Sequence, residues 1–342
     1  MLIAPAIYAF WPESIIFTNL TGSDILFSFS ILLAFYFTIL LIKKDSYYYL
    51  LLSGISIGIA HWFRPLSYIY FISFLFFIFL NGGMKKLRCS IKYALFISLA
   101  YFIIIIPFGL NSFKKTGIFN PLISSPYKGW ILMIGTNFEK NGKYNKEDLN
   151  LLDSLEEQIL MPLEYNSQSS YMPNSSIIEY SPPSPARDSL AREIAINRII
   201  ENPFKIIANG LTVKQKILWA ESAPIFWSMQ GFLSDKEGSI LISQNNILYR
   251  VTSWFSTIYH RSILILVLVG IFYLLKVDRN AYTHKLDIFF TTLLFKIILI
   301  SGLHILVEVQ PRYHHAFLPI FSIIIALAFY IYFLQRTEKI NN

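Results

Sequence analysis

The densest group of reactive side chains lies in residues 308–315, between two strongly apolar stretches. It holds a carboxylate, a guanidinium, a phenol and two imidazoles: Glu308, Arg312, Tyr313, His314 and His315. A guanidinium binds phosphate through paired hydrogen bonds, and the start of a helix favours an anion. We therefore predict a site for an anionic lipid phosphate here, with Arg312, Tyr313 and His314 as ligands. Glu308 is the candidate catalytic carboxylate.

A metal site is the alternative for this segment, since His and Glu are both common metal ligands. Neighbours in sequence do not face each other on a helix, so two adjacent histidines rarely share one ion. His314 and His315 therefore do not form a ligand pair. We predict no metal-ligating residue and no required cofactor, and the sequence leaves a divalent cation open.

Two more charged residues stand at the ends of apolar stretches. Asp24 is either the N-cap of a helix or a supporting catalytic carboxylate that positions a substrate hydroxyl or amine at the membrane boundary. Arg64 stands in a turn between two apolar runs, where an arginine is costly unless it is paired or reaches a phosphate. We predict that Arg64 binds the donor phosphate, and the alternative is that it extends to lipid headgroups.

One ionisable residue falls deep within an apolar stretch. Lys296 lies near the middle of residues 286–305. An ionisable group at that depth indicates function, but a structural pairing with Glu13 or with a backbone carbonyl explains it equally well.

The elements that position these residues are membrane helices. The composition is 54% hydrophobic and 15% charged, which is too apolar for a water-soluble chain of this length. A spanning helix needs roughly 20 mostly apolar residues. Such runs occur at 24–42, 91–110, 262–275, 286–305 and 316–334, in two halves of 47–80 around Arg64, and at 2–17. The predicted fold is therefore an all-α polytopic membrane protein of about eight spans with an inserted α-rich extracytoplasmic domain.

The formal charge of +8 comes largely from short basic connections beside the apolar runs. Placing these connections in the cytoplasm gives one consistent alternation of spans, so the charge does not indicate nucleic acid. We predict a plasma (inner) membrane location with three parts. Residues 1–110 and 261–342 are membrane helices, and residues 111–260 form an extracytoplasmic domain. The lone Cys89 excludes an internal disulfide in that domain.

Within the predicted outer domain, residues 171–185 are rich in Ser and Pro and read as an irregular strap. Asp188 or Ser189 would then cap a helix, and Asn202-Pro203 would end it and begin another. The second helix carries an apolar stripe that begins at Phe204 and rests either on the membrane helices or at the interface. Trp219 and Trp227 would lie in the headgroup zone.

Several segments resemble membrane glycosyltransferases of the GT-C type, and most closely glycosyltransferase family 39, with its protein O-mannosyltransferases and lipid A aminoarabinose transferases. The similar segments are 12–26, which ends in a small-residue acidic step; 58–65 (Gly-Ile-Ala-His-Trp-Phe-Arg-Pro); 129–145; 191–219 with Glu-Asn-Pro-Phe; and Arg312-Tyr313 with Pro319. Each motif is short, and together the motifs follow one another in order over nearly the whole chain.

The resemblance implies a sugar donor carried on a polyprenyl phosphate, membrane lipids as surroundings, and an envelope acceptor that is a lipid, a glycan or a protein. It implies a single inverting displacement, with Arg312 and Arg64 at the donor phosphate. Members of the family begin with another membrane helix and a first outer loop that bears the catalytic acid. The resemblance therefore implies that this chain lacks both, and that Asp24 is a supporting residue.

Three other functions fit the same features. A flippase or transporter of lipid-linked sugars would share the aromatic helices, but it should show inverted repeats. An envelope polysaccharide polymerase would also have a large outer segment and phosphate-binding arginines. A catalytically dead fragment is the third alternative.

Overall fold

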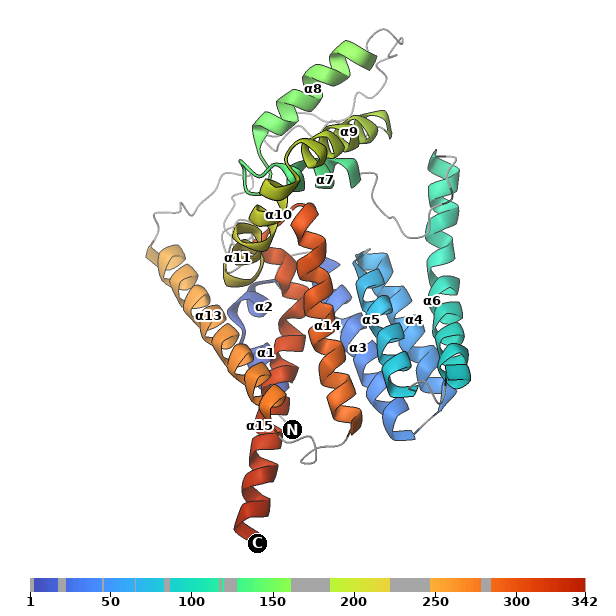
Figure 1. Cartoon of the computed structure of the whole chain (residues 1–342), viewed down its shortest axis with the longest axis vertical. Coiled ribbons are helices and arrows are strands. Elements are labelled where there is room, and N and C mark those ends of the chain that lie inside the picture. The colour runs from blue at the N-terminus through green and yellow to red at the C-terminus, as the bar shows by residue number, and fades with distance from the viewer. Residues whose placement is uncertain are drawn as a thin grey trace. The chain divides into compact units, whose positions relative to one another are not determined.

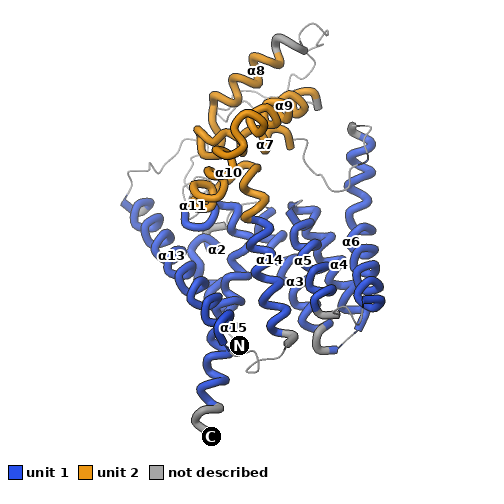
Figure 2. Tube along the Cα trace, viewed as in Figure 1, with its two compact units in different colours: residues 1–124, 218–300, 311–342 blue, residues 125–217, 301–310 orange. Residues whose placement is uncertain are grey.

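The computed structural model describes residues 3–17, 23–44, 46–64, 66–82, 87–116, 119, 128–160, 185–221, 247–277 and 284–341. These residues are almost entirely helical and contain no strand, which confirms the all-α class (Figure 1). They divide into two compact units (Figure 2). Unit 1 comprises residues 1–124, 218–300 and 311–342, and unit 2 comprises residues 125–217 and 301–310. Four predicted features lie outside the described residues: the step at 19–22, Pro65, the strap over 171–184, and Trp227.

Unit 1 opens with two short helices, α1 (Ile3–Ala9) and α2 (Pro12–Phe17). Its longer helices are α3 (Ser23–Lys44), α4 (Tyr47–Phe63), α5 (Ser67–Gly82), α6 (Leu87–Thr116), α13 (Ile247–Lys276), most of α14 (His284–Leu306), and α15 (Leu318–Asn341). A 3-10 helix, η3 (Pro311–Phe317), leads into α15.

Within the described residues, five segments are long and apolar enough to span a membrane, namely Ser23–Leu41, Leu87–Lys114, Tyr249–Lys276, Leu286–Leu306 and Pro311–Thr337. A shorter apolar helix covers Ser67–Leu80. The chain is thus a multi-pass membrane protein, as predicted. The span expected over 2–17 is instead the pair α1 and α2, because Pro12 has no backbone N–H and begins a new helix.

Close contact between α4 and α6 depends on two glycines. A Cβ atom added at Gly54 would lie 2.8 Å from the carbonyl oxygen of Ile97, and one added at Gly58 would lie 2.7 Å from Cβ of Ile104. Small residues spaced four apart let membrane helices approach closely, and dispersion then stabilises the pair. This contact fixes the end of α4 that precedes Arg64.

Unit 2 consists of α7 (Lys128–Thr136), α8 (Lys146–Leu160), α9 (Pro185–Glu201), α10 (Pro203–Leu211), the start of α11 (Val213–Ala220) and the last turn of α14. Its core contains Met133, Leu152, Ala191 and Ala195. The break predicted at Asn202-Pro203 is confirmed. Asp188 does not cap its own helix, however: α9 already begins at Pro185, and Oδ1 of Asp188 accepts the backbone N–H of Trp130 at 3.2 Å.

A buried aspartate ties three elements of unit 2 together. Oδ1 and Oδ2 of Asp148 accept Nδ2 of Asn137 at 3.0 and 3.1 Å. Oδ2 also accepts Nδ2 of Asn145 at 2.9 Å, and Oδ1 accepts Nη2 of Arg198 at 2.6 Å. Both carboxylate oxygens are therefore satisfied within the unit, as stable burial requires.

Candidate functional site

An aspartate and two arginines meet in unit 1 where three elements end or begin. Asp24 lies in the first turn of α3, Arg64 directly follows α4, and Arg312 lies in η3. Nη2 of Arg64 donates to Oδ2 of Asp24 at 2.5 Å, and the charge of Arg312 also acts on the Asp24 carboxylate. The structure thus brings together three of the predicted site residues, from segments far apart in sequence.

Part of the hydrogen-bonding capacity of this group is unused. Oδ1 of Asp24 and Nε of Arg64 are buried, and neither has a hydrogen-bond partner among the described residues. The Arg64 side chain keeps 21% of its surface exposed, so one side of the guanidinium is reachable. A buried polar group without a partner usually indicates an absent ligand or water. The Nε donor of Arg64 can therefore bind an anion, and Oδ1 of Asp24 can accept a hydroxyl or amine hydrogen.

The turn that presents Arg64 is closed by a network that the sequence analysis did not identify. Nδ1 of His61 lies 3.0 Å from the Ser67 hydroxyl and 3.3 Å from the Tyr101 hydroxyl. The backbone N–H of Ser67 donates to the carbonyl of Arg64 at 3.2 Å. All three side chains of the network are buried, which fixes the backbone on both sides of Arg64. A histidine three residues before the Arg-Pro step was the only signal for it in the sequence.

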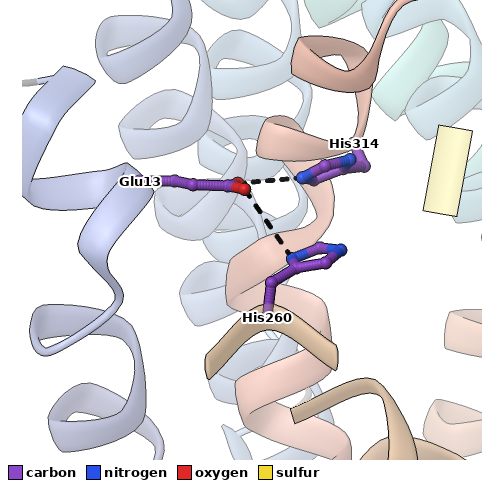
Figure 3. A group of neighbouring side chains, drawn as sticks. All are labelled: Glu13, His260 and His314. Atoms are coloured by element: carbon purple, nitrogen blue, oxygen red, sulfur yellow. Dashed lines mark hydrogen bonds and ion pairs between the residues drawn. The ribbon is translucent and has the colours of Figure 1, made fainter. Parts of the chain in front are cut away.

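A second cluster in unit 1 consists of Glu13, His260 and His314, which point toward one another (Figure 3). Nε2 of His314 lies 2.9 Å from Oε2 of Glu13, and Nδ1 of His260 lies 3.9 Å from Oε1. The two imidazole rings stack with their centroids 4.4 Å apart. The three residues come from α2, α13 and η3, so the cluster joins three elements at one buried point.

Backbone carbonyls fix the tautomers of both histidines. A carbonyl can only accept a hydrogen bond, so Nδ1 of His314 donates to Leu218 at 2.7 Å and Nε2 of His260 donates to Trp219 at 2.7 Å. The other ring nitrogen of each histidine faces the Glu13 carboxylate, and in the neutral form of the ring that nitrogen carries the lone pair. Two lone pairs and an anion repel one another unless a cation, either a proton or a metal ion, lies between them.

This arrangement matches what a divalent metal requires. The three ligand atoms lie within 4.8 Å of one another, and the outer nitrogen of each histidine is held by a carbonyl, as is typical of metal-binding histidines. Two histidines and one glutamate are a common three-ligand set for zinc. The prediction that His314 and His315 do not form a ligand pair is compatible with this cluster, because His314 meets His260 instead. The cluster itself was not predicted, because its members lie far apart in the chain.

The surroundings of His314 differ from those expected of the phosphate ligand that we predicted. Both ring nitrogens of His314 already have partners, Leu218 and Glu13. His315 is buried and interacts through charge with Glu13, His314 and Arg64, so it lies between the two clusters. The guanidinium of Arg312 lies 5.7 Å from the ring centre of Tyr313.

Glu308 belongs to unit 2 and has its own neighbours there. Its backbone N–H donates to the carbonyl of Ile131 at 3.0 Å, and Oε1 accepts Nε2 of Gln310. Nζ of the nearby Lys214 donates to three carbonyls, those of Gly135, Ile305 and Val307, at 2.7 to 2.9 Å. Burial lowers the pKa of Lys214 to about 7, and the Glu308 charge opposes the shift.

Lys296 pairs with neither of the two predicted partners. Among the described residues its Nζ has no hydrogen bond. Instead it lies 3.6 Å from the ring centre of Phe35, 4.4 Å from that of Phe74 and 5.3 Å from that of Tyr70. Aromatic faces attract a cation, so this cage joins α14 to α3 and α5.

Comparison with known proteins identifies a similar family for the first 110 residues of the chain. Residues 1–110 match the family model of dolichyl-phosphate-mannose-protein mannosyltransferases. No curated protein and no solved structure matches the chain. The matched segment contains Glu13, Asp24 and Arg64. It confirms the resemblance to GT-C type glycosyltransferases and supports a membrane enzyme that uses a polyprenyl-phosphate-linked sugar donor.

Proposed function

We propose that this chain binds a polyprenyl-phosphate-linked sugar at the outer face of the plasma (inner) membrane and takes part in sugar transfer to an envelope acceptor. The observation that carries the proposal is the group Asp24, Arg64 and Arg312 at the start of a membrane span, where Arg64 bonds to the Asp24 carboxylate and the charge of Arg312 also acts on it. A lipid phosphate would lie beside these arginines, and the sugar would extend away from the bilayer.

In this reaction the acceptor oxygen or nitrogen attacks the anomeric carbon of the donor sugar. The bond between that carbon and the phosphate oxygen breaks, and the polyprenyl phosphate leaves with one more negative charge. A carboxylate removes the proton of the acceptor group. Arg64 and Arg312 stabilise the charge that develops on the leaving phosphate, and Asp24 holds Arg64 in place. Glu308 remains the candidate base, and its carboxylate accepts a hydrogen bond from Gln310.

Binding of polyprenyl phosphate in lipid nanodiscs tests the first step directly. Arg312→Ala removes a phosphate contact and little packing, so the affinity should fall about tenfold or more, as expected for loss of a charged hydrogen bond. Arg336→Ala, an exposed arginine at the far end of α15, is the matched control and should bind normally. Equal affinity of the Arg312 variant and the control would refute the proposed site. Binding without sugar transfer in the unmodified chain would favour the flippase alternative.

We further infer that Glu13, His260 and His314 bind one divalent cation, with zinc favoured by the ligand types. The specific observation is that each histidine bonds to a backbone carbonyl through one ring nitrogen and turns the other toward one buried carboxylate. Such an ion would fasten α2 and α13 to η3, which carries Arg312.

Metal analysis of the purified full-length chain tests this inference. The unmodified protein should hold one zinc equivalent after dialysis against zinc, and His260→Ala should lose it. His304→Ala is the matched control, because that histidine is also buried but bonds within unit 2. Equal zinc content in the unmodified protein and both variants would show that the site is not a metal site. Absence of zinc in all three would assign the cation between Glu13 and the histidines as a proton.

A further inference from the structure

We propose that an apolar stripe on α9 and α10 of unit 2 lies in the bilayer interface and contacts phospholipid. The stripe consists of five side chains spaced four, four, three and four residues apart: Ile196, Ile200, Phe204, Ile207 and Leu211. Phe204 is 85% exposed and Ile200 is 71% exposed, values unusual for residues of this size. Helical spacing places Ile196 and Ile200 on one face of α9, and Phe204, Ile207 and Leu211 on one face of α10, so each helix presents a group of exposed apolar side chains rather than single ones.

The opposite face of α10 is anchored to the end of a membrane span. Ile206 and Gly210 are buried. A Cβ atom at Gly210 would lie 2.7 Å from Cγ2 and 2.9 Å from Cα of Ile305, which stands in the last turn of the span Leu286–Leu306. The glycine therefore lets α10 rest directly on the backbone of that turn.

Polar contacts fasten the following helix to the same turn. Nε2 of Gln215 donates to the carbonyl of Ser301 at 3.0 Å, and Nζ of Lys214 donates to that of Ile305 at 2.9 Å. The Ile305 carbonyl is one of the last four of α14, which lack partners within the helix, and Ser301 lies one turn earlier. The end of α10 and the start of α11 are thus attached to the last turns of α14, where this span leaves the hydrocarbon core.

That attachment determines the environment of the stripe. The headgroup layer begins where a span ends, and a helix is about 10 Å across. A helix that rests on the last turn of a span therefore lies within or beside this layer. Its outward apolar face gains about 25 cal/mol per Å² of surface removed from water when lipid covers it.

The charge beside α10 indicates the kind of lipid. Residues 203–220 contain Lys205, Lys214 and Lys216 and no acidic residue, whereas the end of α9 carries Arg198 and Glu201. Lys205 and Lys216 are exposed. An apolar face bordered by lysines is the pattern of helices that lie on anionic lipid. The surface therefore fits an anionic phospholipid leaflet.

Site-directed spin labelling of the full-length chain in proteoliposomes tests the proposal. Cys89→Ser provides a cysteine-free background, and Phe204→Cys places the nitroxide on the stripe. Asn150→Cys, an exposed position on the polar helix α8, is the matched control. The label at 204 should collide several-fold more slowly than the control with a water-soluble nickel reagent and more rapidly with oxygen, which concentrates in lipid. A second label at Ile200→Cys should behave as the label at 204 does.

Two outcomes would overturn the proposal. Equal nickel accessibility at 204 and 150 would place the stripe in water. Shielding of 204 from both nickel and oxygen would indicate a protein partner, such as a second copy of the chain. The measurement requires no sugar transfer, so its result is independent of the proposed enzymatic function.

Discussion

Two buried aspartates, one in each unit, differ in how their carboxylates are satisfied. In unit 2, Asp148 receives hydrogen bonds on both oxygens, from two amides and from Arg198. In unit 1, Asp24 receives one from Arg64, and its Oδ1 has no hydrogen-bond partner among the described residues. A fully bonded carboxylate holds a fold together, whereas a half-bonded one leaves room for a ligand to complete the network. The difference distinguishes a structural centre from a binding site.

The largest effect should come from removing the structural centre. Asp148→Ala removes the acceptor that Nη2 of Arg198 and two amides share, so the free energy of unfolding of unit 2 should fall by about 3 kcal/mol. Limited proteolysis of the full-length chain at increasing urea concentrations measures this free energy of unfolding. Glu147→Ala removes the exposed pair with Lys140 and should leave that energy nearly unchanged. Comparable losses in the two variants would contradict the structural role of Asp148.

Asp24→Asn should lower sugar transfer strongly and stability only slightly. The substitution keeps the shape of the side chain but removes the charge that orients Arg64, so sugar transfer should fall about tenfold or more. The free energy of unfolding should change by less than about 1 kcal/mol, since the pair is partly exposed. Sugar-transfer assays and urea unfolding on the same preparation distinguish the effect on transfer from the effect on stability. The comparison between the aspartates fails if Asp24→Asn destabilises the chain as strongly as Asp148→Ala does.

A smaller effect is expected from the turn that holds Arg64. Ser67→Ala removes the hydroxyl next to His61, and the loss of about 1 kcal/mol should weaken binding of polyprenyl phosphate roughly fivefold. Ser67→Thr should restore binding. Ser73→Ala is the matched control, because the Ser73 hydroxyl bonds only within α5 among the described residues. A uniform loss of binding in both alanine variants would argue against a positioning role for Ser67.

The smallest effect concerns how the stability of unit 2 depends on pH. Burial lowers the pKa of Lys214 in the folded chain to about 7 from the ordinary value of 10.5. Between these values the unfolded chain binds more protons, so the free energy of unfolding should rise as the pH increases through this range. The three carbonyls that accept from Nζ favour the charged form and reduce the rise. Thermal unfolding at several pH values should show this rise in stability. In Lys214→Met, stability should depend less on pH. A free energy of unfolding that falls as the pH rises through this range would contradict a lowered pKa for Lys214.

The sequence predicted the elements better than the contacts between them. Apolar runs located the spans because the bilayer requires roughly 20 apolar residues for each one. The break at Asn202-Pro203 was correct because proline restricts the backbone locally. The span over 2–17 was wrong because Pro12 starts a separate helix there.

The candidate site was predictable only in part. Asp24, Arg64 and Arg312 were selected individually, since a charge beside an apolar run is conspicuous. Their meeting could not be read from one sequence, because it depends on how three distant elements pack. Glu13 and His260 were missed as a pair with His314 for the same reason. The carbonyls that fix the two histidine tautomers also become visible only once the chain has folded.

The aromatic cage around Lys296 has a consequence for how the protein enters the membrane. A lysine at the centre of a spanning helix opposes insertion by about 2.5 to 3.5 kcal/mol. The rings of Phe35, Tyr70 and Phe74 belong to α3 and α5, which are synthesised well before α14. These helices are therefore already in place when Lys296 leaves the ribosome. Insertion of α14 should thus depend on its predecessors, and biogenesis of the chain should proceed in order from the N-terminal helices.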